Sequence, residues 1–257
     1  MKKTTPFKSP VEFEKELTSF SNKFKVSIRA HSKRISDYFE MSCYRMIVRY
    51  YEALGYSMSV CNLVGGAFRF KCSPMGHIHN FSYFKASKKV LNGQCEEFYI
   101  FHNATVQSAF DDDVFTTPDI VVSRVAKPDF TDDYYLTSKL KLSYIGRENL
   151  ITFCEAKHYN PFPELMINFI GTVNELKPKC LVNGEDVPQS NVHIAPALMM
   201  SGTFSKQAER IRNSFERRYF VNFFDNLFDD VAISKLIAAP TVHNHATLKN
   251  RSNRTSF

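Results

Sequence analysis

The stretch LITFCEAKHY, Leu150–Tyr159, decides the fold because it begins like a buried strand and ends in charge. Its first half is mostly apolar, whereas Glu155 and Lys157 are charged and two residues apart. Side chains alternate between the two faces of a strand, so residues spaced by two point the same way. We therefore expect Glu155 and Lys157 to form a paired acid and base where a strand reaches a cleft.

A second strand with an acidic start lies upstream, in TTPDIVVSRV at Thr116–Val125. Pro118 suits the opening of a strand because its missing N–H is tolerated there. If this strand lies beside the first, Asp119 joins Glu155 and Lys157. Two carboxylates so placed repel one another unless a cation lies between them, and all-oxygen ligation suits Mg²⁺ or Mn²⁺. A lysine beside the metal can activate a water and offset charge growing on a phosphate.

The elements around these two strands predict an α/β (α+β) fold with a central mixed sheet flanked by helices, and with N-terminal and C-terminal helical additions. Hydrophobic periodicity predicts a helix at 37–54 that Gly55 ends, and later helices from about 160 to 173 and from 205 onward to 228. Short β-like runs predict strands at 56–64, 66–73, 97–106 and 192–202. The last predicted strand is reached through a helical crossover.

On these residues the chain resembles the PD-(D/E)xK nuclease superfamily, whose signature would be Pro118-Asp119 followed by Glu155-Ala156-Lys157. The resemblance covers roughly residues 37 to 200 and implies a restriction-endonuclease-like αβββαβ core. It implies Asp119, Glu155 and the Ala156 carbonyl as metal ligands, with Lys157 at the attacking water. The implied function is an Mg²⁺- or Mn²⁺-dependent deoxyribonuclease that hydrolyses phosphodiester bonds in restriction, defence or DNA processing.

Each half of this signature, PD and ExK, also occurs once elsewhere in the sequence. Pro128-Asp129 also reads PD but lacks a following apolar strand, and Glu175-Leu176-Lys177 reads ExK at an expected helix end, where spacing by two separates side chains. Context therefore favours the pair built on Asp119 and Glu155. Because Glu155 follows Asp119 by 36 residues, we expect the segment 127–148 to be an excursion that contacts substrate.

Glu40 is a further catalytic candidate, because the superfamily often adds an acid from its first core helix. The alternative is structural, since Asp37 and Glu40 have the spacing of a capping box, in which the glutamate serves the helix terminus.

A basic face on the last predicted helix suggests contact with a phosphate backbone. Its predicted nucleic-acid-binding residues are Lys206, Gln207, Arg210 and Arg217, with Arg212 and Arg218 beside them. Glu209 and Glu216 are interspersed, so a merely solvated face is the alternative. The whole chain has 33 Lys and Arg against 26 Asp and Glu, a formal charge of +7, which favours a polyanionic partner where the charge is clustered.

At 257 residues and 44% hydrophobic content the chain is expected to form one elaborated domain, with its core at about 37–228, a basic leader at 1–36 and a flexible tail at 240–257. Six widely spaced cysteines without a CxxC motif suggest reduced thiols in a cytoplasmic protein, not a zinc site. No run approaches the roughly 18 apolar residues of a membrane span. Cleavage of both DNA strands would favour a homodimer.

Two histidine pairs, His77 with His79 and His243 with His245, are expected not to bind metal, and His158 is expected to be structural. Two other functions stay open. One is a catalytically inactive protein of the same fold that binds nucleic acid or a partner, and the other is a nuclease directed at RNA.

Overall fold

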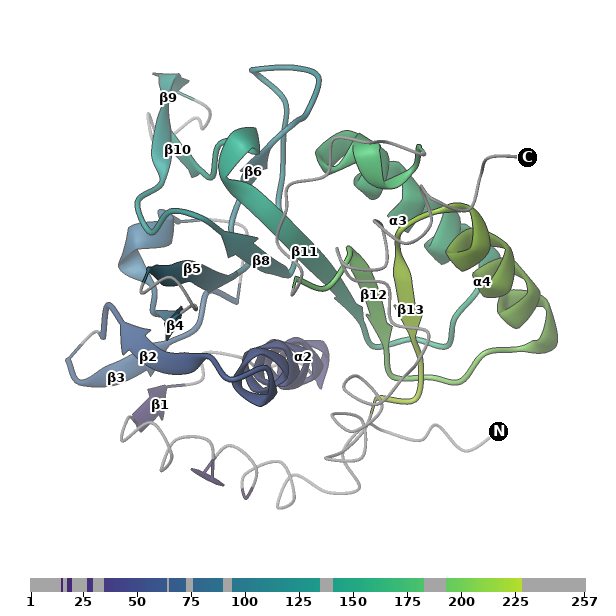
Figure 1. Ribbon diagram of the computed structural model, residues 1–257, viewed down its shortest axis with the longest axis horizontal. Coiled ribbons are helices and arrows are strands. Elements are labelled where there is room, and N and C mark those ends of the chain that lie inside the picture. The colour runs from purple at the N-terminus through teal and green to yellow at the C-terminus, as the bar shows by residue number, and fades with distance from the viewer. Residues whose placement is uncertain are drawn as a thin grey trace.

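The computed structural model describes residues 35–63, 65–72, 76–89, 94–134, 141–182 and 193–227, with short stretches at 15, 18–19 and 27–29. These residues form an α/β fold with a mixed central sheet (Figure 1). Most of the predicted leader, the whole predicted tail, and the pair His243 and His245 lie outside the described residues.

The central sheet has seven strands in the order β13-β12-β11-β8-β5-β4-β2. The strands are β2 (Ser57–Cys61), β4 (Tyr83–Lys89), β5 (Cys95–His102), β8 (Ile120–Ser123), β11 (Leu150–Lys157), β12 (Ala197–Met200) and β13 (Asn222–Phe224). Neighbours from β2 to β11 are antiparallel, whereas β11, β12 and β13 are parallel. The predicted helical crossover between β11 and β12 is confirmed.

Three helices cover the two faces of this sheet, α2 (Ile35–Ala53) on one face and α3 (Pro163–Leu176) with α4 (Lys206–Arg218) on the other (Figure 1). The alternation along β8 shows the division: Ile120 and Val122 belong to the core beneath α2, whereas Val121 belongs to the core beneath α3 and α4. Each strand of the middle of the sheet is therefore buried on both faces, which explains the continuous apolar runs in the sequence.

The first helix ends where the sequence predicted. Gly55 has a positive φ of 87°, and the Tyr56 N–H donates to the Tyr51 carbonyl across the last turn. This left-handed cap suits glycine because it has no Cβ. The helix is buried on more sides than a single stripe requires, since Met41, Arg45 and Val48 are buried as well.

The prediction of one helix from 205 to 228 is wrong beyond Arg218. Tyr219 is extended and the chain continues into β13, which pairs in parallel with β12. Phe223 packs in the core beneath α3 and α4, while Phe224 packs against the core beneath α2. Side chains that alternate between two faces require a strand, so burial against the sheet overrides the helical spacing.

Three smaller two-stranded sheets lie outside the central sheet in the described part of the chain. They are β1 (Ser27–Arg29) with β3 (Ala67–Arg69), β6 (Val106–Gln107) with β7 (Phe115–Thr116), and the hairpin of β9 (Asp129–Tyr134) and β10 (Lys141–Tyr144), with short 3-10 turns η1 (Ile78–Asn80), η2 (Arg147–Asn149) and η3 (Pro178–Cys180). The β9-β10 hairpin is the predicted excursion, and it lies toward the Leu150 end of β11, away from Lys157 (Figure 1).

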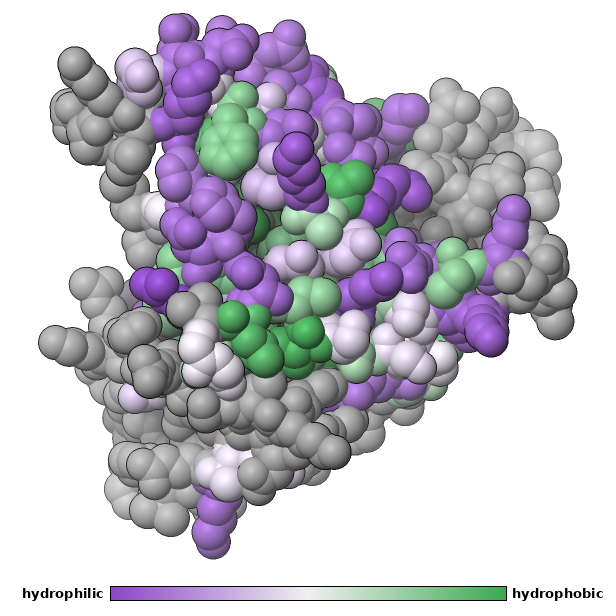
Figure 2. Space-filling model, turned by 90° about the vertical axis from the view of Figure 1, so that its left-hand side faces the viewer, coloured by the Kyte–Doolittle hydropathy of each residue, from purple (hydrophilic) through white to green (hydrophobic). Residues whose placement is uncertain are grey.

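The two lateral edges of the sheet differ. Seen from the β2 side, the described surface is mostly hydrophilic, with apolar residues gathered near its centre (Figure 2). The basic helix α4 packs beside β13 at the opposite edge. The basic residues of α4 and the β2 edge therefore belong to different sides of the molecule.

Candidate active site

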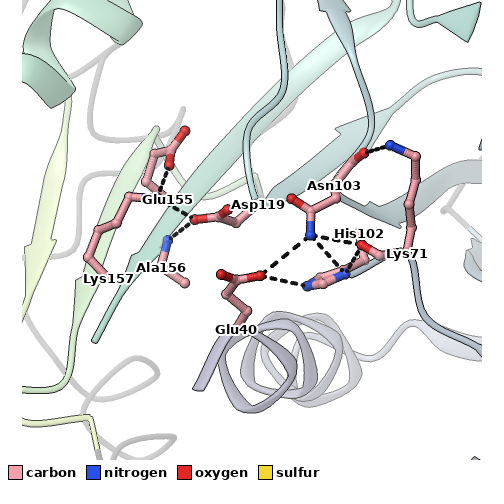
Figure 3. Close-up of polar contacts among 8 residues, drawn as sticks. All are labelled: Glu40, Lys71, His102, Asn103, Asp119, Glu155, Ala156 and Lys157. Atoms are coloured by element: carbon pink, nitrogen blue, oxygen red, sulfur yellow. Dashed lines mark hydrogen bonds and ion pairs between the residues drawn. The ribbon is translucent and has the colours of Figure 1, made fainter. Parts of the chain in front are cut away.

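Asp119 and Glu155 are neighbours across two strands, although the β9-β10 hairpin lies between them in the sequence. Ile120 pairs with Cys154 in the antiparallel ladder of β8 and β11, so the next position along brings Asp119 opposite Glu155. Figure 3 shows both carboxylates together with Lys157. The structure thus brings the three predicted side chains into one place.

Hydrogen bonds fix this group closely. Asp119 Oδ2 accepts from the Ala156 N–H at 2.7 Å and from Lys157 Nζ at 2.9 Å. Lys157 Nζ also lies 2.8 Å from Glu155 Oε2. The carboxylate side chains are 10% and 14% exposed and the lysine side chain is 34% exposed, so Lys157 has the most contact with solvent of the three.

The charges in this group are unevenly compensated. Burial alone would lower the pKa of Lys157, but Glu155 and Asp119 offset that effect and raise the pKa above its usual value. Burial and the neighbouring Asp119 raise the pKa of Glu155. Lys157 therefore stays an ammonium ion at neutral pH, while one lysine does not neutralise two buried acids.

Glu40 lies beside this group and does not cap its helix. The helix begins at Ile35, two residues before Asp37, so the capping-box alternative is not what the structure shows. Glu40 Oε2 lies 3.4 Å from Asn103 Nδ2 and 3.9 Å from His102 Nε2. Burial, and then the charge of Asp119, raise the pKa of Glu40 to about 7.

Sequence patterns did not predict the polar residues that lie behind Glu40. His102 Nδ1 lies 3.0 Å from the Lys71 carbonyl, which can only accept, so Nδ1 carries the proton and Nε2 faces Glu40 without one. Burial lowers the pKa of His102 to about 4, so the ring stays neutral. Lys71 is buried, and its Nζ donates to the Asn103 carbonyl at 2.6 Å. Asn103 has a left-handed backbone, which is uncommon for residues other than glycine. No residue spacing in the sequence predicts this conformation.

The donor set suits a divalent metal by its chemistry, because Asp119, Glu155 and the Ala156 carbonyl all offer oxygen. Ionising both acids beside a single lysine is unfavourable, as the raised pKa of Glu155 indicates, and a divalent cation would offset that repulsion. Within the described ranges, however, no three His, Cys, Asp or Glu side chains stand ready to hold an ion. Lys157 Nζ lies between the two carboxylates, 2.9 Å from Asp119 Oδ2 and 2.8 Å from Glu155 Oε2.

The predicted nucleic-acid-binding residues lie on α4. Lys206, Gln207, Arg210 and Arg217 are all exposed. The helix follows β12, whose end is tied to the catalytic strand by a hydrogen bond from the Ser201 N–H to the Lys157 carbonyl. Arg212, by contrast, is engaged within the helix, 3.5 Å from Glu209 and 3.9 Å from Glu216.

The remaining sequence candidates lie elsewhere. Asp129 of the second PD motif is exposed on β9, and Lys177 of the second ExK motif caps the end of α3. His77 and His79 stack on one another beside Phe130. His158 interacts with the Ser201 hydroxyl at 2.8 Å and lies against the ring of Phe39. All six cysteines are free.

Comparisons of the chain with protein-family models, with curated proteins and with solved structures found no match. Among the described residues, no helix is long and apolar enough to cross a membrane.

Proposed function

We propose that this chain is a divalent-metal-dependent endonuclease of the PD-(D/E)xK type that hydrolyses phosphodiester bonds of DNA. The observation that carries the proposal is the convergence of Asp119, Glu155 and Lys157 across two adjacent strands, with the Ala156 N–H bonded to Asp119. A strand end that merely emerges into solvent does not need two buried carboxylates.

The element order supports the same class. Taken in sequence, α2, β5, β8, β11, α3 and β12 follow the order αβββαβ. Asp119 directly precedes the second of these strands and Glu155 lies on the third, and α3 follows the strand that carries Glu155 and Lys157. We infer that these elements are a restriction-endonuclease-like core, with β2, β4 and β13 as additions.

The residues have distinct functions in this mechanism. Asp119, Glu155 and the Ala156 carbonyl would hold Mg²⁺ or Mn²⁺, which would supply Lewis-acid stabilisation of the charge that develops on the phosphate. Lys157, held as an ammonium ion, orients the attacking water and offsets negative charge on the nonbridging oxygens. Because its pKa is raised, Lys157 does not take the proton of the water. Glu40, with a pKa of about 7, is the nearby group whose protonation changes near neutral pH.

The test uses plasmid and linear DNA with Mg²⁺, Mn²⁺ or EDTA. We expect the wild-type protein to cleave in either metal but not in EDTA, and Asp119→Ala and Lys157→Ala to lose at least about 100-fold in rate. The chain offers matched controls in Asp129→Ala, in the second PD motif, and Lys85→Ala, a strand lysine 2.7 Å from Glu97. Both controls are expected to cleave normally.

Three outcomes would change this conclusion. Absence of cleavage with retained DNA binding would leave a nucleic-acid-binding protein of the same fold. Cleavage of RNA but not DNA would change the substrate. Undiminished cleavage by both Asp119→Ala and Lys157→Ala would place the active site elsewhere.

A further inference from the structure

Asn103 joins three segments that are far apart in the sequence, and it does so next to the acidic group. It follows directly on β5 and is buried, with a left-handed φ of 51°. Asparagine is one of the few residues with a side chain that adopts this conformation readily. The conformation turns both the backbone and the side chain of Asn103 toward polar partners.

The backbone of Asn103 holds Asp119. Its N–H donates to the Asp119 carbonyl at 2.8 Å, and its own carbonyl accepts from the buried Lys71 Nζ at 2.6 Å. Asp119 precedes β8, so the first of these bonds fixes the chain where the carboxylate leaves the sheet. The second bond ties the turn after β5 to the segment after β3.

The side chain of Asn103 holds Glu40. Its Nδ2 donates to the Lys71 carbonyl at 2.8 Å and lies 3.4 Å from Glu40 Oε2 (Figure 3). The short bond to the Lys71 carbonyl fixes the amide, and the fixed amide then presents its other proton to the glutamate. One buried residue thus contacts the carboxylate from α2 and the backbone of the aspartate from β8.

We propose that Asn103 is a positioning residue that sets the placement of Glu40 relative to Asp119 at the metal site. This inference rests on the proposed function and goes beyond it, because it assigns Asn103 to the placement of the acids and not to the binding of metal or substrate. Groups behind metal ligands typically change metal affinity or activity by 10- to 100-fold when they are removed. A buried asparagine that merely satisfies its own turn would change stability alone.

The experiment compares Asn103→Gly with Asn62→Gly. Glycine accepts the left-handed backbone, so the turn is kept while the side chain is removed. Asn62 is a matched control, since its φ is 57° and its Nδ2 also donates to two carbonyls, those of His79 and Phe81, away from the acids. Asn103→Ser, whose hydroxyl is too short to reach Glu40, gives the same measurement if the glycine variant does not fold.

The first measurement is Mn²⁺ affinity by isothermal titration calorimetry without nucleic acid. We expect Asn103→Gly to bind Mn²⁺ about tenfold more weakly than wild type, and Asn62→Gly to bind normally. On plasmid DNA, kcat should fall by a similar factor with KM unchanged. In combination with Glu40→Gln, Asn103→Gly should weaken Mn²⁺ binding by less than the sum of the two single effects, because it acts partly through Glu40.

Equal Mn²⁺ affinity and kcat in Asn103→Gly and Asn62→Gly would overturn the inference. If wild type neither binds Mn²⁺ nor cleaves DNA, the proposed function fails instead. In that case the crystal structure of Asn103→Gly still decides the positioning function: displaced carboxylates of Glu40 and Asp119 support it, and unmoved carboxylates refute it.

Discussion

Replacing Lys157 by methionine separates the two effects of its ammonium group. Methionine keeps an unbranched side chain of similar length but removes the charge that lies 2.9 Å from Asp119 Oδ2 and 2.8 Å from Glu155 Oε2. In the metal-free protein this charge takes the place of a cation between the acids. If the proposed site binds Mg²⁺, the ion would compete with this ammonium group for the two carboxylates, so the variant is expected to bind Mg²⁺ more tightly and to lose cleavage.

The size of the effect follows from the two contacts. A hydrogen bond to a charged group contributes about 1.5–3 kcal/mol, and the partial exposure of Lys157 reduces this by about half. Together the two bonds therefore stabilise the fold by about 1.5–3 kcal/mol. If Mg²⁺ binding recovers about half of that loss, its affinity for Lys157→Met rises by about 4- to 13-fold. The rate of DNA cleavage should fall at least about 100-fold.

Calorimetric titration with Mg²⁺, joined to thermal unfolding with and without Mg²⁺, measures these quantities. The titration is made at pH 9, because Lys157 lowers the pKa of Glu155 and removing its ammonium group makes Glu155 hold its proton more tightly. Lys85→Met is the control, since Lys85 on β4 pairs with Glu97 on β5, outside the group of Asp119, Glu155 and Lys157. Unchanged or weaker Mg²⁺ binding by Lys157→Met would refute the reasoning that the lysine occupies the place of a cation.

Three further predictions concern charge and packing. Asp119→Asn removes the carboxylate charge, so cleavage should fall at least about 100-fold. It keeps an acceptor for the Ala156 N–H, so calorimetry should show a loss of unfolding free energy below about 1.5 kcal/mol. The pKa of Glu40 is about 7 in the folded protein and 4.5 in the unfolded chain, so the native state binds the carboxyl proton more tightly. The contribution of protonated Glu40 to stability is therefore lost as pH rises from 4.5 to 7. Glu40→Gln should flatten a plot of melting temperature against pH over that range. The groups that face Glu40 are Asp119, Asn103, Lys157, Asp37 and His102. Urea unfolding should show Gly202→Ala to be less stable than wild type by about 1–3 kcal/mol, because the added Cβ collides with Asn160. Gly171→Ala lies in open space on α3 and should be more stable by about 0.5–1 kcal/mol.

The group of Asp119, Glu155 and Lys157 could be predicted because each part of it leaves a local pattern. Strand alternation places Glu155 and Lys157 on one face, and a proline-led apolar run marks the strand that begins after Asp119. What the sequence could not provide is the pairing of the two strands, which depends on the fold of the residues between them. The structure supplies it through the ladder in which Cys154 pairs with Ile120.

The last helix was predicted too long for an identifiable reason. Phe215, Tyr219 and Phe223 recur every four residues, which is the spacing of a helical face. Phe215 and Phe223 do meet, with ring centroids 5.9 Å apart, but across the break between α4 and β13. A helical spacing can therefore mark side chains that pack together without marking one helix.

The shell of Lys71, His102 and Asn103 shows a different limit. The residues that interact in this shell lie on α2 and on or next to β3, β5 and β8, so no short window of sequence contains the interaction. Their burial also explains why the acids behave as they do, because a low-polarity surrounding raises the pKa of Glu40 and leaves the charges short of water.

The same burial links stability and function at this site. A buried acid with a raised pKa costs stability when it ionises, and in the proposed mechanism the cation offsets that cost. Neutralising Glu40 removes the cost and also removes a negative charge that attracts the cation. The acidic group is therefore placed where the fold tolerates it poorly, and in the proposed mechanism that cost is the source of its attraction for a cation.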